Sequence, residues 1–144
     1  RSADNFPYLP HSGDLVFLPE ATPEWAVAKF LGDWCNRRYG LLAESLYYVT
    51  DTSKGKKAGL AKQDFGRNVP STYKILSVDD ESAAVSHVIV EILFDKGEEK
   101  IFRELSVRTV CQDEDNNSVI RSENSRGWKI IQNSFTSVLY TVDL

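Results

Sequence analysis

The sequence predicts an α+β domain in which N-terminal helices pack on a curved antiparallel sheet of four or more strands. Three observations support this fold class. Apolar residues recur at helical spacing in the first half of the chain, the period changes to two after Pro70, and short polar turns separate the later strands. A length of 144 residues fits one domain. We expect a single domain over residues 22–144, preceded by an extended arm over residues 1–21.

The first helix is predicted to begin at Thr22-Pro23-Glu24, which supplies a hydroxyl cap, a proline at the first helical position and an acid near the positive end of the helix dipole. One apolar stripe follows: Val27, Phe30, Leu31 and Trp34. Asp33 is expected on the polar flank. We expect the helix to break or bend at Gly40, because glycine is about 1 kcal/mol less favourable than alanine in a helix.

Two further helical pieces are predicted before the sheet. The first covers residues 41–48 and continues the apolar face. Residues 50–57, TDTSKGKK, are expected to form a solvated loop, and a short helix is expected over residues 58–67 before Pro70.

Four later segments are rich in valine, isoleucine, threonine and aromatic residues, as is typical of strands. They are residues 71–78, 83–94, 100–112 and 128–140. Their short connections favour antiparallel hairpins. Ser86, Val88, Val90, Ile92 and Phe94 share a face that is predicted to join the core. The opposite face is mixed in character, as expected of a sheet partly covered by a loop or a partner.

Composition excludes some functions. A net charge of −4 argues against a dedicated nucleic-acid-binding protein. No apolar run is long enough to cross a bilayer. The chain begins at Arg1 and contains no methionine, so we expect a piece of a longer protein, with an exported or membrane-anchored parent slightly favoured. Cys35 and Cys111 are interpreted as two separate buried thiols or, alternatively, as an isolated disulfide.

Two local patterns resemble those of the nuclear transport factor two-like superfamily, a cone-shaped, cystatin-like α+β fold. They are FLGDWCNRRYGLLAESL over residues 30–46 and GWKII over residues 127–131. The resemblance covers residues 22–140 and implies a pocket between the helices and the sheet. Some members use this pocket for isomerisation, dehydration or epoxide opening, and other members use the fold for binding or assembly.

No catalytic residue set is predicted. The sequence lacks a nucleophile elbow, a phosphate-binding loop and metal-ligand spacing, so no cofactor or metal is expected. If the chain is an enzyme, the general base would be Asp33, Glu91 or Glu104, with Tyr39 or Tyr47 as hydrogen-bond donor.

Two other candidate sites are predicted. The first is a small-ligand pocket lined by aromatic side chains: Trp34, Tyr39, Tyr47, Phe65, Phe102 and Trp128. The second is a basic patch made of Arg37, Arg38, Lys56 and Lys57, which is interpreted mainly as a solvated helix face and alternatively as a binding surface.

The sequence thus favours a non-enzymatic binding or assembly domain with a protein partner, including a homodimer through the sheet face. A small-molecule enzyme that uses a pocket carboxylate is the first alternative. A cystatin-like peptide-binding or inhibitor module is the second.

Overall fold

A computed structural model describes residues 22–46, 54–82, 84–112 and 127–131; the predicted N-terminal arm and Tyr47 lie outside these ranges. Three helices precede four strands: α1 (Pro23–Cys35), α2 (Tyr39–Glu44), α3 (Lys54–Phe65), β1 (Thr72–Asp80), β2 (Val85–Asp95), β3 (Lys100–Gln112) and β4 (Gly127–Ile130). The predicted order of helices followed by strands is confirmed.

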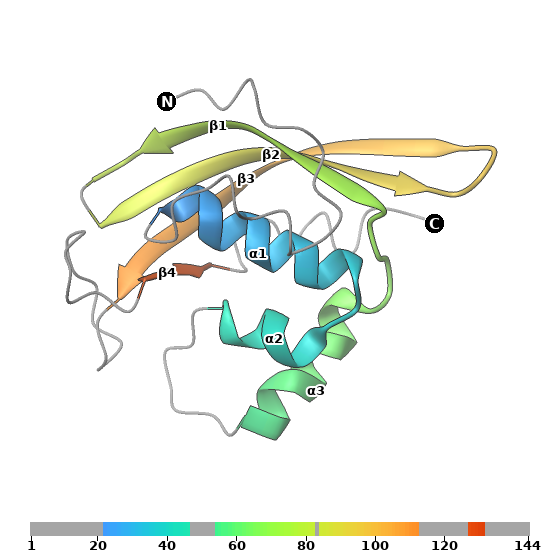
Figure 1. Cartoon of the computed structure of the whole chain (residues 1–144), viewed down its shortest axis with the longest axis horizontal. Coiled ribbons are helices and arrows are strands. Elements are labelled where there is room, and N and C mark those ends of the chain that lie inside the picture. Colours follow the sequence, from blue (N-terminus) through green and yellow to red (C-terminus); the bar gives the residue numbers. More distant parts are fainter. Residues whose placement is uncertain (1–21, 47–53, 83, 113–126, 132–144) are drawn as a thin grey trace.

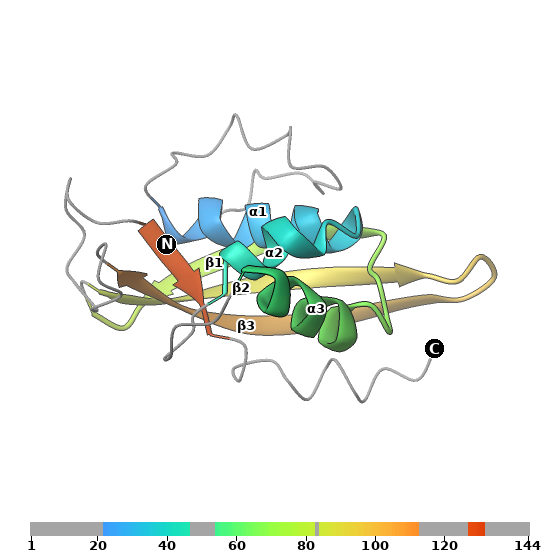
Figure 2. The same ribbon diagram turned by 90° about the horizontal axis from the view of Figure 1, so that it is seen from below.

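The strands form one sheet in the order β1-β2-β3-β4, and every neighbouring pair is antiparallel. Helix α1 lies across one face of this sheet, with α2 and α3 side by side next to it (Figure 1). Figure 2 shows the sheet from its edge, with α1 on one face and no described helix on the opposite face. The protein is therefore an α+β domain, as predicted.

Helix α1 begins as its sequence predicts. The backbone N–H of Trp25 donates to the Thr22 hydroxyl oxygen at 3.3 Å, and Pro23 occupies the first helical position. Val27, Phe30, Leu31 and Trp34 are all fully buried against the sheet. Burying each such side chain contributes about 1.5–3 kcal/mol, so this stripe is the main attachment of α1 to the sheet.

The break after α1 comes earlier than predicted. The helix ends at Cys35, and Gly40 lies inside α2. Arg37 adopts a left-handed φ of 57°, its N–H donates to the Trp34 carbonyl, and the Arg38 N–H donates to the Asp33 carbonyl. This pair of hydrogen bonds is a Schellman C-cap. The prediction failed because it assigned the break to the nearest glycine, whereas an arginine adopts the left-handed conformation here.

The helical pieces after this turn also differ from the prediction. Helix α3 begins at Lys54, inside the segment predicted to be a loop. Lysine favours the helical conformation, but this segment has no apolar period, so the sequence pattern did not indicate a helix here. Helix α2 stops at Glu44, and Leu46 then forms a parallel bridge with Ile130 of β4.

The register of the sheet separates an inner face from an outer face. The predicted inner residues of β2, from Ser86 to Phe94, are all buried. A register shift between Ile75 and Ser77 keeps Val78 on the inner side. Only residues 128–131 of the predicted 128–140 strand lie in the described ranges. Within the described ranges, no helix is long and apolar enough to cross a membrane.

Candidate functional site

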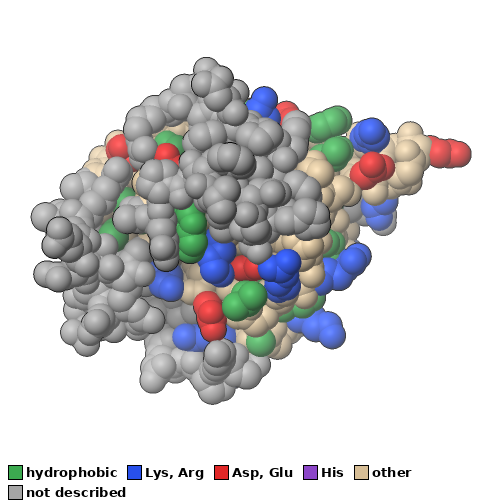
Figure 3. Space-filling view, in the orientation of Figure 1, with side chains coloured by type: hydrophobic (Ala, Val, Ile, Leu, Met, Phe, Trp, Pro, Cys, Tyr) green, Lys and Arg blue, Asp and Glu red, His purple; other side chains and the backbone are tan. Residues whose placement is uncertain are grey.

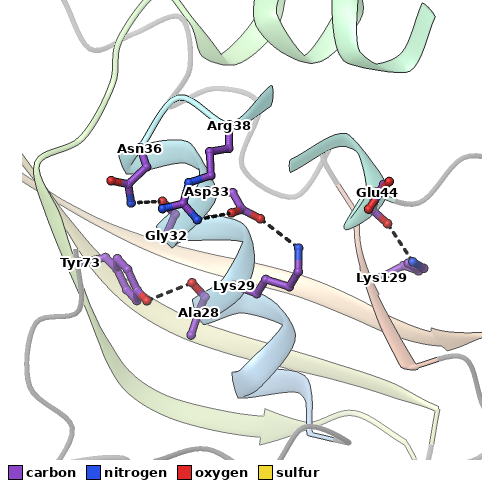
Figure 4. A network of polar contacts seen from close by, with 9 residues as sticks. All are labelled: Ala28, Lys29, Gly32, Asp33, Asn36, Arg38, Glu44, Tyr73 and Lys129. Carbon is purple, nitrogen blue, oxygen red and sulfur yellow. Dashed lines mark hydrogen bonds and ion pairs between the residues drawn. The ribbon is translucent and has the colours of Figure 1, made fainter. Parts of the chain in front are cut away.

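Asp33 is buried at the end of α1, with 1% of its side chain exposed. The Lys29 Nζ donates a hydrogen bond of 2.9 Å to its Oδ2, and a guanidinium nitrogen of Arg38 lies 3.8 Å from its Oδ1 (Figure 4). The expectation that Asp33 lies on a polar flank is therefore wrong. Because its partners reach it from the same helix and from the following turn, the carboxylate joins the end of α1 to that turn.

The neighbouring polar contacts also involve backbone carbonyl groups of the helices. The Asn36 side-chain amide donates to the Gly32 carbonyl at 2.8 Å, and the Tyr73 hydroxyl donates to the Ala28 carbonyl at 2.9 Å. Lys129 of β4 donates to the Glu44 carbonyl at 2.8 Å, which places a cation at the negative end of α2 (Figure 4).

The other two candidate carboxylates lie on the outer face of the sheet. Glu91 of β2 and Glu104 of β3 are direct cross-strand partners. Their strand positions alternate with the buried residues Val90 and Leu105, so their side chains point away from α1. The structure thus brings Glu91 and Glu104 together and places Asp33 on the other side of the sheet.

Two of the aromatic candidates pack together in the main core. Trp34 and Phe65 are fully buried, with ring centroids 5.3 Å apart at 80°. Phe30 and Phe94 add edge-on contacts to the same cluster. The indole N–H of Trp34 donates to the Phe65 and Asn68 carbonyls, at 2.8 and 3.1 Å. These rings fill the space between α1, α3 and the sheet.

The remaining aromatic candidates are dispersed. Tyr39 is partly buried and packs against the main core, whereas Trp128 belongs to a smaller cluster with Ala26 and Cys111. Phe102 is 49% exposed on the outer face of the sheet. Tyr47 lies outside the described residues.

The basic patch is an exposed surface around α2 and α3. Arg37, Arg38 and Lys56 are exposed, and Lys57 is partly buried. Figure 3 shows Lys and Arg side chains over the region of α2 and α3, with acidic side chains at the tip of the β2–β3 hairpin. Arg37 and Arg38 form the turn after α1, so their position is explained by the C-cap and by the ion pair with Asp33.

Both cysteines are free thiols, which excludes the disulfide interpretation. Burial raises the pKa of Cys35 to about 12. The Cys35 thiol is therefore protonated at neutral pH and is a poor nucleophile. Among the described residues, no group of three or more histidine, cysteine, aspartate or glutamate side chains could hold a metal ion.

The outer sheet face combines exposed apolar and charged side chains. We define it by four cross-strand rows, each running from β1 through β2 to β3: Thr72–Leu93–Phe102, Lys74–Glu91–Glu104, Ser77–Ile89–Ser106 and Asp79–His87–Arg108. Its first row carries Phe102, the most exposed of the large apolar residues in the described ranges. An exposed aromatic side chain next to charges is typical of protein-binding surfaces.

Sequence reasoning identified part of this surface. It named Glu91, Glu104 and Phe102 as candidates, and the register places all three on this face. Lys74, which lies opposite Glu91, was missed. The alternation in β1 gave a signal for it, but the register shift after Ile75 prevents pairing from sequence spacing alone.

The fold and these surfaces define an α+β domain with one helix-covered sheet face. No protein-family model matches the chain, and no curated protein matches it. The structure is similar to the crystal structure of a SEC-C motif containing protein from Psychrobacter arcticus, with a TM-score of 0.56 and 11% sequence identity. The similarity covers 94% of this chain and 70% of that protein. At this identity the likeness concerns the fold alone.

Proposed function

We propose that this chain is a non-enzymatic assembly domain of nuclear transport factor two-like architecture, which binds a protein partner through its outer sheet face. One observation carries the proposal: the outer sheet face combines the half-exposed Phe102 with Leu93, Ile89 and charged neighbours, and no described helix covers it. Antiparallel sheets that face water usually carry polar residues there, so this apolar content favours a partner.

The arrangement of the carboxylates supports assembly over catalysis. Acid–base chemistry in a pocket needs titratable groups that converge on one substrate. Asp33 is held between two cations, while Glu91 and Glu104 lie across the sheet from it. The core rings of Trp34 and Phe65 occupy the region where the sequence predicted a pocket.

The proposal is tested by carboxylate footprinting of the protein in its native assembly. Glu104 and Glu98 are both exposed, but only Glu104 lies on the outer sheet face. A water-soluble carbodiimide with an amine label should modify Glu104 less than Glu98 in a gentle extract of the producing cells. After the extract is diluted under dissociating conditions, the two should react alike. Equal labelling of both residues before dilution would rule out an occupied outer face.

A further inference from the structure

We propose that the side of the molecule formed by α2 and α3 docks on a lipid bilayer that contains anionic phospholipid. This α2–α3 surface consists of the exposed leucines Leu41 and Leu60 and of the cations around them, which include the basic patch. It shares no residue with the outer sheet face, so the inference goes beyond the proposed function.

The apolar part of the α2–α3 surface is a pair of leucines. Leu41 of α2 is 43% exposed and Leu60 of α3 is 40% exposed. In the described part of the chain, Phe102 is the third large apolar residue with an exposed side chain, and it lies on the outer sheet face. A single exposed leucine is common on protein surfaces, but two of them on neighbouring helices form a shared apolar feature.

The two leucines point away from the core on helices that pack together. Helices α2 and α3 lie side by side (Figure 1), and a methyl group at Gly66 would lie 3.3 Å from the Tyr39 hydroxyl oxygen, so the end of α3 is close to the start of α2. The buried side chains of the two helices are Leu42, Ala43, Ala61 and Phe65. Figure 3 shows hydrophobic side chains between Lys and Arg side chains over α2 and α3.

Cations surround these leucines. Lys56 precedes Leu60 by four positions, and Arg38 precedes Leu41 by three, so each cation is about one helical turn from its leucine. Between residues 37 and 67, the side chains that the structure describes include six cations and two acids: Arg37, Arg38, Lys56, Lys57, Lys62 and Arg67, with Glu44 and Asp64. Lys129 adds a cation beside Glu44, since its Nζ donates to the Glu44 carbonyl.

This positive surface belongs to a negatively charged chain. The net charge is −4, so the rest of the chain carries more acids than bases. Asp95, Glu98 and Glu99 are exposed at the β2–β3 hairpin. Such a charge distribution turns the positive side toward an anionic surface and the negative side away from it.

The composition of the α2–α3 surface favours a bilayer over another macromolecule. Protein interfaces are depleted of lysine and enriched in aromatic residues, whereas here Lys56, Lys57 and Lys62 accompany leucines. Nucleic acids are bound by phosphate contacts and aromatic stacking, to which leucines contribute little. At a membrane interface both residue types are used, because leucines enter the acyl boundary and cations attract anionic headgroups.

Co-sedimentation of the full chain with lipid vesicles tests the proposal. The protein should bind vesicles of phosphatidylcholine with about 30% phosphatidylserine, should not bind vesicles of phosphatidylcholine alone, and should bind less as the salt concentration rises. Lys62→Gln and Arg67→Gln should each lower the affinity for the anionic vesicles roughly fivefold. Leu41→Gln/Leu60→Gln should lower it by about tenfold or more, because the apolar contact is lost while every cation remains.

Two substitutions elsewhere are matched controls. Lys96→Gln removes an exposed cation on the β2–β3 turn, and Phe102→Gln removes an exposed apolar side chain from the outer sheet face. Neither should change vesicle binding. Circular dichroism checks that each variant is folded, and if the double leucine variant does not fold, Leu60→Gln alone replaces it and should still weaken binding.

The outcomes separate a bilayer from other partners. Wild-type protein that does not bind the anionic vesicles would overturn the proposal. Full binding by the leucine variant with weak binding by the Lys62 and Arg67 variants would also overturn it, since a surface that responds to charge alone fits an acidic protein or a nucleic acid. The proposed function is judged separately, by the protection of Glu104 on the outer sheet face.

Discussion

Replacing Asp33 by asparagine removes a charge from a buried side chain and leaves its size nearly unchanged. The lost interaction is the hydrogen bond of 2.9 Å from Lys29, which in its charged form is worth about 1.5–3 kcal/mol. The contact with Arg38, 3.8 Å away and with that side chain 43% exposed, adds less than about 1 kcal/mol. Asparagine keeps an acceptor and is easier to bury than a carboxylate, which offsets part of the loss. We expect the free energy of unfolding to fall by about 1–2 kcal/mol.

Urea denaturation followed by tryptophan fluorescence measures this change. Glu98→Gln is the control, since it neutralises an exposed carboxylate on the β2–β3 turn and should change stability by less than about 0.5 kcal/mol. A cycle with Lys29→Gln isolates the pair and should give a coupling of about 1 kcal/mol. A rise in stability on replacing Asp33 would refute the reasoning, because buried carboxylates kept for catalysis are commonly held at the expense of stability.

Three further predictions concern the helices and the buried thiol. Gly59→Ala should stabilise α3 by about 1 kcal/mol, because the added methyl group meets no neighbouring atom. Gly66→Ala should destabilise the fold, because its methyl group would clash with the Lys62 carbonyl oxygen. Equal effects of the two substitutions on the free energy of unfolding in chemical denaturation would contradict the described end of α3. Arg37→Gly should raise the free energy of unfolding by roughly 0.5–1 kcal/mol, since glycine adopts a φ of 57° without strain; Arg37→Ala is the control that should give no gain. Burial raises the pKa of Cys35 from 9.0 to about 12, so its thiol loses a proton at lower pH in the unfolded chain than in the folded one. The contribution of Cys35 to stability is therefore complete below pH 9 and declines as the pH rises toward 12. Cys35→Ala should therefore show a shallower fall of the unfolding free energy over this range, with a difference of at most about 1.4 kcal/mol per pH unit; parallel pH profiles would exclude the shift.

The parts of the fold that were predictable have strong local signals. The start of α1 follows from the chemistry of a hydroxyl cap and a proline, and both act within one turn. The strands follow from side-chain alternation, which depends on the backbone alone. The end of α1 was missed because the left-handed Arg37 is selected by hydrogen bonds to the preceding turn. The residue type at that position does not indicate a left-handed conformation.

The candidate sites were less predictable because they depend on contacts between distant segments. Asp33 is buried because the turn after α1 folds back over it, which its position on a helical wheel does not indicate. Phe102 and Trp128 were grouped with Trp34 as aromatic residues, yet they lie on different sides of the sheet or in different clusters. The grouping of residues into the cross-strand rows of the outer face requires the register of three strands, which sequence spacing leaves open.

The short strand β4 adds a residue to the main core that comes late in the described sequence. Ile130 is fully buried in the main core, and its N–H donates to the Ser45 carbonyl at 2.7 Å while its strand pairs with β3. The core that begins with α1 is therefore completed only after residue 130 has left the ribosome. Until then the nascent chain carries α1, α2, α3 and three strands, and the position that Ile130 occupies in the core is unfilled. Contacts of such long sequence separation slow folding, so this domain is expected to fold after its synthesis is nearly complete.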